Sequence, residues 1–302
     1  MATSTSTVSS PVTVPAVRDW RRRLTPVFLI VPGLLFLLLF FFGAMWYMLN
    51  YSFYSFDSGS LTRDWSLASW QAFFTDPFYW QILWRTTQLG FTVTVIALLL
   101  GYPIAYALTR LRRPRLLVAI YLAIFSPLLV SVVVRSYGWL LLLGQEGLVN
   151  KLLAGLPFIE GPQRLVHNNT GVVVALVHIL LPFAVFPMVS VLTQLPPNLK
   201  EAAQDLGASR LQTFLRVVLP LSLPGIIAAG QIVFVLSISA LVTPILLGGG
   251  RVLVLSRLIF QNIAELNWPM AAVQAFVLLA MALLILLSFT QLNRLTSTVR
   301  GR

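Results

Sequence analysis

A polar stretch between two long apolar runs, residues 196–220, holds the side chains best suited to a directed interaction. Asn198 is a good N-cap residue, and Glu201 stands three positions later, where it can reach back to the cap amide. Four apolar residues follow helical spacing: Leu199, Ala202, Ala203 and Leu206. These residues favour binding to another protein surface, because the alanines let such a surface approach the backbone of an amphipathic helix closely. The alternative is a surface helix that packs on its own bundle.

Gly207 divides this stretch into two helices. Glycine readily adopts the left-handed conformation that ends a helix, so the first helix should stop there. Ser209 and Gln212 form a second capping pair, which predicts that a new helix begins directly after the glycine. Pro220 and Pro224 predict a bend where this second helix enters the next apolar run.

Residues for covalent, metal-assisted or nucleotide chemistry are sparse. The chain has no cysteine, and no paired carboxylates, metal ligands or Ser/His/Asp set can be assembled within the apolar runs. Its two lysines, Lys151 and Lys200, lie outside any G-x-x-x-x-G-K-S/T phosphate-binding loop. We therefore expect no catalytic residue, no metal and no cofactor in this chain, and any ATP should be hydrolysed on a separate subunit.

Aromatic and polar side chains in or near the apolar runs could line a path for a solute. Aromatic rings can hold a cation over their faces, and glutamates in external segments could stand at the mouth. The candidates are Phe91, Tyr102, Tyr137, Glu146, Gln231, Thr243 and Glu265. The alternative for each ring is ordinary helix packing, and the amide and hydroxyl can equally join helices. No acidic residue lies inside a predicted span, which weighs against an ion-coupled carrier.

The elements that must position these residues are membrane helices. The chain has 302 residues, of which 58% are hydrophobic and 10% charged, as in an integral membrane protein. Six apolar runs can cross a hydrocarbon layer of about 30 Å: residues 27–49, 86–108, 116–134, 171–192, 221–247 and 270–290. The fifth is long enough to tilt or bend at Pro244, and the leucines at 140–143 fit a re-entrant or interfacial piece. The predicted fold is all-α with six spans.

Lysine and arginine set the predicted orientation. Most of the 21 basic residues fall on the cytoplasmic side when the N-terminus is placed there, and both termini are then cytoplasmic. The net charge of +12 is therefore mainly an orientation signal, and we expect no nucleic-acid partner. The loop at 196–220 also faces the cytoplasm in this arrangement.

This loop resembles the EAA loop of bacterial ABC importer permeases. The family pattern is Glu-Ala-Ala, three residues, glycine, nine residues, isoleucine, any residue and Leu-Pro, and the chain departs from it only by Val217 for isoleucine. The resemblance implies the type I ABC importer permease fold and a loop that docks into a cleft of an ATPase subunit. The residues that would couple the two are Glu201, Ala202, Ala203, Leu206, Gly207 and Pro220. Glu201 can serve as a helix cap as well.

Three further stretches, residues 132–150, 241–249 and 267–272, resemble the first permease subunit of spermidine/putrescine importers. Relatives that move other small solutes share them, so the solute stays open between a polyamine and an opine, an amino-acid derivative or an oxyanion. The resemblance implies a second, non-identical permease, two ATPase subunits that carry ATP and magnesium, and a periplasmic solute-binding protein. A stand-alone channel or secondary carrier is the alternative of another class.

The predicted organisation has three parts. Residues 1–25 form a basic, disordered cytoplasmic tail, and residues 26–295 form the permease domain that contains the loop. Residues 296–302 form a short cytoplasmic tail. The location implied by the resemblance is the bacterial inner membrane, where lipids surround the spans.

Overall fold

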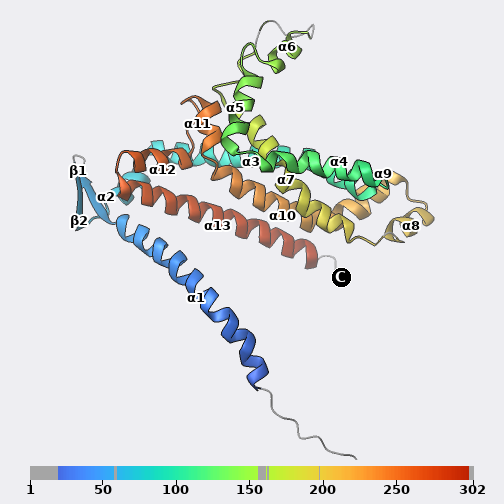
Figure 1. Ribbon diagram of the computed structural model, residues 1–302, viewed down its shortest axis with the longest axis horizontal. Helices are drawn as coiled ribbons and strands as arrows, with labels where there is room; N and C mark the ends of the chain where they lie inside the picture. The colour runs from blue at the N-terminus through green and yellow to red at the C-terminus, as the bar shows by residue number, and fades with distance from the viewer. Residues whose placement is uncertain (1–19, 58–59, 156–160, 162, 197, 299–302) are drawn as a thin grey trace, which may run out of the picture. The chain divides into compact units, whose positions relative to one another are not determined.

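The computed structural model describes residues 20–298, except 58–59, 156–160, 162 and 197 (Figure 1). The chain divides into two compact units, residues 1–50 and 51–302, and each is described by itself. The first unit contains helix α1, Trp20–Tyr51, of which residues 30–51 are long and apolar enough to cross a membrane. Because α1 begins at Trp20, it includes the last residues of the predicted tail 1–25. Residues 1–19 and 299–302 lie outside the described residues.

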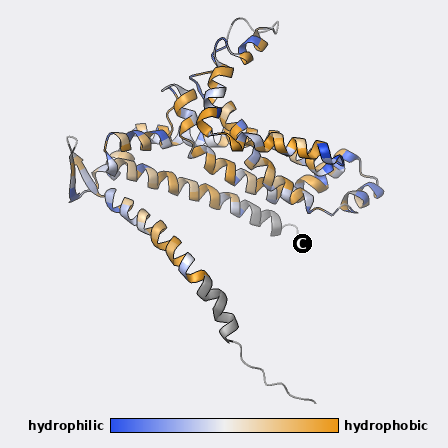
Figure 2. Cartoon of the chain, viewed as in Figure 1, coloured by the Kyte–Doolittle hydropathy of each residue, from blue (hydrophilic) through white to orange (hydrophobic). Residues whose placement is uncertain are grey.

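Three long helices form the core of the second unit: α3 (Pro77–Arg110), α7 (Asn169–Thr193) and α10 (Leu219–Ile238). They pack against one another, and most of their buried apolar side chains belong to one hydrophobic cluster. Val93 of α3, Met188 of α7 and Val233 of α10 are all fully buried. Figure 2 shows apolar residues along all three helices, which fits helices that face both protein and lipid.

A glycine brings α3 and α10 close together. A Cβ added at Gly90 would lie 2.5 Å from Cγ2 of Ile238 and 2.8 Å from Cε2 of Phe234. These separations are below van der Waals contact, so no larger residue fits without movement. Membrane helices use small residues in this way, because close backbone approach increases packing where the hydrophobic effect no longer distinguishes protein from lipid.

The third predicted span is broken in the structure. The helices there are α4 (Pro114–Phe125), a 3-10 turn (Ser126–Leu129), α5 (Val132–Leu143) and α6 (Leu148–Ala154), with a bend of 103° between residues 114–129 and 132–154. The prediction of one run over 116–134 was therefore wrong at its C-terminal end. Pro127 has no N–H for the carbonyl of Ala123, and Ser126 Oγ donates to that oxygen instead, at 3.3 Å.

The leucines at 140–143 form the last turn of α5, which ends at Leu143 with Gly144 as its C-cap. They continue a helix that starts at Val132, and the bent pair that contains this helix has the length and composition of a broken span or a re-entrant loop. Ser131 caps this helix, because its Oγ accepts a hydrogen bond from the N–H of Val133 at 3.3 Å. The new helix direction therefore has its own start signal after the break.

The fifth predicted span also breaks, but four residues before the bend that was expected at Pro244. Helix α10 ends at Ile238, and the short helix α11 covers Val242–Gly248. A proline ring excludes the carbonyl four residues earlier from the helix ladder, and that carbonyl belongs to Ala240. Ser256 Oγ donates to this oxygen at 2.7 Å, so the lost backbone bond is replaced by a side chain.

Outside residues 196–220, the remaining elements of the described chain are a hairpin and three helices. Among them, only the last helix was predicted, as the apolar run 270–290. Strands β1 (Tyr54–Asp57) and β2 (Ser60–Trp65) pair antiparallel, and helix α2 covers Ala68–Thr75. Helices α12 (Leu255–Ala264) and α13 (Trp268–Thr298) follow α11. Phe73, Ile82 and Leu255 lie in a second buried cluster that joins α2, α3 and α12.

Within the described ranges, five helices are long and apolar enough to cross a membrane, and the bent pair raises the number to six if it counts as one span. The prediction of an all-α membrane protein with six spans is confirmed, although the third span is bent and the fifth ends at Ile238. Helices α8 (Asn198–Asp205) and α9 (Arg210–Thr213) lie between α7 and α10. They form the predicted polar loop.

Candidate functional site

The turn between α8 and α9 has the geometry that the sequence predicts. Gly207 has φ +83°, in the left-handed region. Its N–H donates to the carbonyl of Gln204 at 2.9 Å, and the N–H of Ala208 donates to the carbonyl of Ala203 at 3.0 Å. This pair of bonds is the Schellman motif, which satisfies carbonyls at the end of a helix. No described atom lies within 4 Å of a Cβ added at Gly207, so backbone conformation and not space requires glycine.

The second capping box is also confirmed. The N–H of Ser209 donates to Oε1 of Gln212 at 2.9 Å, and the N–H of Gln212 donates to Oγ of Ser209 at 3.3 Å. Asn198, the predicted cap of the first helix, is the first residue of α8. Position 197 lies outside the described residues. The turn between α8 and α9 is therefore held by four hydrogen bonds, two on the α8 side and a reciprocal pair on the α9 side.

The apolar stripe of this loop is open to its surroundings. Leu206 is 89% exposed and Leu211 is 66% exposed, while Ala203 is half-buried. Glu201 and Ala202 are exposed as well. Large apolar side chains on an otherwise polar surface mark a contact face. The alternative reading, a helix packed on its own bundle, does not describe Leu206.

A π-helical segment, Phe214–Val218, connects α9 to α10. The N–H of Leu219 bonds to the carbonyl of Phe214, five residues earlier, which is the π spacing. Pro220 lies in the first turn of α10, where its missing N–H removes a normal helical bond. The sequence predicts a bend at this place, and the structure accommodates the proline with a wider turn.

Aromatic contacts join this segment to α3. The ring of Phe214 meets the rings of Tyr102 and Tyr106 edge-on, at centroid distances of 5.9 and 5.3 Å. The hydroxyls of Tyr102 and Ser222 share a hydrogen bond of 2.9 Å. Tyr102, a predicted path residue, therefore ties α3 to α10 near the loop. A displacement of α9 would reach α3 through these rings.

Three other predicted path residues join helices. Gln231 Nε2 of α10 donates to the carbonyl of Leu286 at 3.1 Å and to Oγ1 of Thr290 at 3.0 Å, both in α13. Thr243 of α11 is buried and shares a hydrogen bond of 3.0 Å with Ser136 of α5. The ring of Phe91 packs against that of Phe234 at 4.9 Å, although its other side is exposed.

The last three path candidates are exposed and lie on separate elements. Tyr137 is on α5, and Glu146 follows α5 and lines a cavity of about 410 Å³ together with Lys151. Glu265 ends α12, where its Oε1 accepts from Gln261 Nε2 at 2.9 Å. The structure does not bring the seven candidates into one site. Their role in a path stays a prediction.

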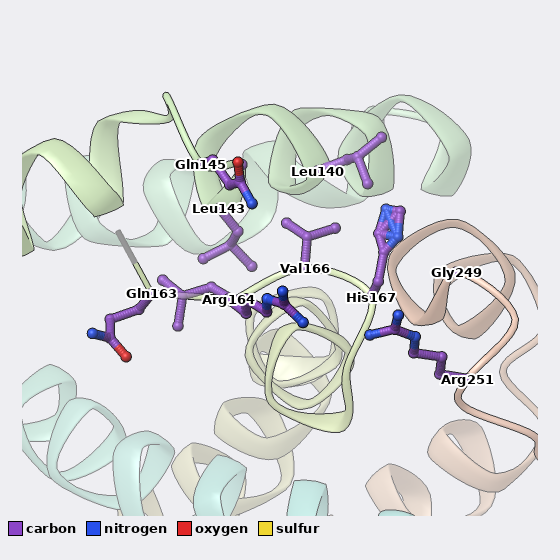
Figure 3. A pocket seen from close by; sticks show the side chains of 11 residues that line it. Leu140, Leu143, Gln145, Gln163, Arg164, Val166, His167, Gly249 and Arg251 are labelled. Carbon is purple, nitrogen blue, oxygen red and sulfur yellow. The ribbon is translucent and has the colours of Figure 1, made fainter. Parts of the chain in front are cut away.

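Sequence reasoning missed two adjoining cavities, of about 530 and 410 Å³, which share His167 and Arg251. Arg164 lines one of them and Arg85 the other. Figure 3 shows the side chains of Arg164 and Arg251 extending toward one another near His167. The described residues that line these two cavities include no carboxylate, so the lining has positive potential. The arginines come from three distant stretches, which hid the cluster in the sequence.

The backbone around these cavities is fixed by an unusual residue. His167 has φ +61°, and its N–H donates to the carbonyl of Leu247 at 2.7 Å. A fourth arginine, Arg135 of α5, is not in the lining of either cavity, and its buried Nε and Nη1 atoms have no hydrogen-bond partner in the described part of the chain. Unpaired guanidinium nitrogens in a low-dielectric surrounding attract anionic groups.

Comparison with known proteins places the chain in a family. A model described as "Binding-protein-dependent transport system inner membrane component" matches residues 13–300. The spermidine/putrescine transport system permease protein PotB of Haemophilus influenzae is 33% identical over 224 residues, covering 73% of this chain and 77% of that protein. The inner membrane ABC transporter permease protein YdcU of Escherichia coli K12 is 33% identical over 278 residues, covering 84% and 88%.

Solved structures show the same fold at low sequence identity. A chain of a bacterial alginate ABC transporter, in complex with an alginate pentasaccharide-bound periplasmic protein, superposes with a TM-score of 0.73 at 16% identity, covering 93% of this chain and 98% of that one. A chain of the MetNI methionine ABC transporter gives a TM-score of 0.54 at 18% identity, covering 74% and 99%. The predicted importer permease fold is thereby confirmed. The chain belongs to the family of binding-protein-dependent transport system inner membrane components, the permease subunits of ABC importers.

Proposed function

We propose that this chain is one of two permease subunits of an ATP-driven importer in the bacterial inner membrane, and that it moves a polyamine or a similar small organic solute. The observation that carries the proposal is the polar loop, with its Schellman turn at Gly207 and the uncovered side chain of Leu206. The similarity of the chain to PotB permeases, which are named for spermidine and putrescine, supports the solute class.

The other parts of the importer are proposed from the same similarity. Two ATPase subunits bind ATP and magnesium and hydrolyse the nucleotide, a second permease completes the path, and a periplasmic binding protein delivers the solute. The alginate transporter, which shares the fold, was solved with a periplasmic protein bound. The orientation follows the arginines, with both termini and the loop 196–220 in the cytoplasm.

The proposed mechanism is alternating access driven through the loop. Helix α8 docks in a cleft of the ATPase, and closure of the ATPase pair displaces it. The hydrogen bonds at Gly207 and Ser209 keep α8 and α9 at a fixed angle, so they move together. The contact of Phe214 with Tyr102 and Tyr106 passes the displacement to α3, while the π-helical segment passes it to α10.

A second solute class is favoured by the arginines of the two cavities that share His167 and Arg251, called the outer cavities because the proposed orientation places them on the periplasmic side. A polyamine is cationic, and the lining that contains Arg85, Arg164 and Arg251 would repel it. A solute with a carboxylate or another oxyanion would instead gain charge-assisted hydrogen bonds there. The two candidates therefore differ in the sign of the charge that the outer cavities favour.

Purification tests the importer and calorimetry tests the solute. A tagged chain, expressed with its neighbouring transport genes, should co-purify with an ATPase, whereas a stand-alone channel or carrier would be purified alone.

Glu201→Lys reverses the charge on the exposed face of α8 and should separate ATP hydrolysis from uptake while the protein still inserts. The cognate binding protein, titrated with spermidine, putrescine and a carboxylate-bearing analogue, identifies the solute. Binding of the analogue alone would replace the polyamine with the second class.

A further inference from the structure

A polar cavity of about 550 Å³ lies between the end of α3 and the loop. Its polar lining comes from three elements: Arg110 of α3, Gln204 of α8, and Arg210 and Thr213 of α9. Figures 1 and 2 show α8 and α9 at the end of the bundle where hydrophilic residues gather. A cavity of this volume is large enough for a small ligand or a headgroup. Its lining shares no residue with the outer cavities and includes no predicted path residue, although Phe214 of the lining contacts Tyr102.

The guanidinium of Arg110 is held in place. Its Nη2 donates to the hydroxyl of Tyr106 at 2.7 Å, and its Cζ lies 5.1 Å from the centre of that ring. These contacts use the ring face and one N–H, so most of the five guanidinium donors can address a ligand. An arginine oriented in this way loses little side-chain entropy when it binds an oxyanion.

The buried hydroxyl of Thr213 is a second observation that favours a ligand in this cavity. Thr213 is only 4% exposed, and its Oγ1 is buried with no hydrogen-bond partner in the described part of the chain. Leaving a buried hydroxyl unsatisfied destabilises a protein. The same residue lines the cavity. A ligand oxygen that reached this hydroxyl would remove the penalty.

The charge of the cavity selects the ligand. Two guanidiniums line it, and its described lining residues include no carboxylate. Arg110 is the last residue of the membrane-crossing α3, and Arg112, Arg113 and Arg115 follow directly. Arginine pairs bind phosphate through parallel hydrogen bonds, and basic pockets between helix ends at the membrane surface bind lipid headgroups.

We propose that this cavity binds a phosphate group, supplied by the headgroup of an anionic phospholipid at the membrane surface. A phosphate bound here would join α3 to α8 and α9 through Arg110 and Arg210, beside the Phe214 contacts. It would hold the loop in one position relative to the bundle. The lipid composition of the membrane would then adjust how strongly the loop responds to its partner, independently of the solute.

Native mass spectrometry of the purified importer complex tests the site. Delipidated complex is titrated with phosphatidylglycerol, with phosphatidylcholine and with inorganic phosphate, for the wild type and for Arg110→Gln/Arg210→Gln. We expect saturable phosphatidylglycerol binding that the double variant weakens at least tenfold. Arg112→Gln/Arg113→Gln, which removes an equal charge at residues outside the cavity lining, is the matched control and should change the affinity less than threefold.

The arms of the experiment separate the source of the phosphate. Inorganic phosphate that binds and is lost in the double variant, without a lipid effect, supports the phosphate site and assigns it to a soluble anion. Equal affinity of the double variant and the wild type for every ligand would overturn the proposal. If the double variant fails to assemble, Thr213→Val replaces it, because this change removes only the hydroxyl and should weaken binding several-fold. An unchanged affinity in Thr213→Val would count against the site as well.

Discussion

Replacing Gly207 by proline should separate ATP hydrolysis from transport, and the structure sets the size of the effect. Proline fixes φ near −65°, whereas the native angle is +83°. It also removes the N–H that bonds the carbonyl of Gln204, and the change in φ breaks the bond from Ala208 to Ala203. Two backbone hydrogen bonds at about 1 kcal/mol each and about 1 kcal/mol of lost turn geometry destabilise the native angle between α8 and α9 by roughly 3 kcal/mol.

Alanine at the same position gives the internal comparison. A Cβ meets no described atom within 4 Å, so Gly207→Ala pays only the strain of a positive φ, about 1 kcal/mol. Asparagine tolerates this region better than alanine and should cost less. The native turn should therefore be depleted about 100-fold in the proline variant and about fivefold in the alanine variant, at 1.4 kcal/mol for each factor of ten.

The assay is reconstitution of the importer in proteoliposomes, with ATP hydrolysis and solute uptake measured on the same sample. We expect the ratio of uptake to hydrolysis to fall strongly in Gly207→Pro, moderately in Gly207→Ala and slightly in Gly207→Asn. Insertion is checked by the yield of assembled complex. If the proline variant transports as well as the alanine variant, the turn does not fix the angle of α8 and the reasoning is refuted.

Three further predictions concern other parts of the chain. Leu206→Asp should reduce the amount of ATPase that co-purifies by tenfold or more, because a leucine buried at an interface contributes about 2 kcal/mol; unchanged co-purification would place the contact elsewhere. Gly90→Val should lower the thermal unfolding midpoint of the complex, because overpacking α3 against Phe234 and Ile238 costs about 1–3 kcal/mol. Gly138→Val is its control, since a Cβ there meets no described atom within 4 Å, and equal shifts in both variants would contradict the close approach. Arg164→Gln/Arg251→Gln should reduce uptake of a carboxylate-bearing solute several-fold, as charge-assisted hydrogen bonds contribute about 1.5–3 kcal/mol; uptake of such a solute at the wild-type rate would remove the outer cavities from its path.

Local signals in the sequence predicted the loop well. Gly207, Ser209 and Gln212 act on neighbours within five residues, and the structure reproduces the turn and the second capping box that they predict. The spans were predicted for the same reason, because the length and apolar composition of a run are enough to indicate a membrane helix. The break in the fifth span was displaced, because a proline acts on the carbonyl four residues earlier, here that of Ala240, and a local reading places the bend at the proline itself.

Features that depend on distant residues were not predictable. The hairpin of β1 and β2 is a local feature, and it was missed because its strands cover only four and six residues. The outer cavities collect Arg85, Arg164 and Arg251 from stretches that are far apart in the chain. The predicted path residues were chosen by side-chain type, and Gln231 and Thr243 show that such types also serve as helix-to-helix hydrogen bonds.

The serine that replaces the lost bond at Ala240 has a consequence for permeability. An open carbonyl inside a membrane protein is a resting place for water, and a file of waters relays protons across the bilayer. Ser256 donates to this oxygen at 2.7 Å, so the chain changes direction between α10 and α11 while the oxygen keeps a partner within the protein. A transporter that must let one solute through without dissipating the proton gradient gains from a kink whose freed carbonyl is hydrogen-bonded by a side chain of the same chain.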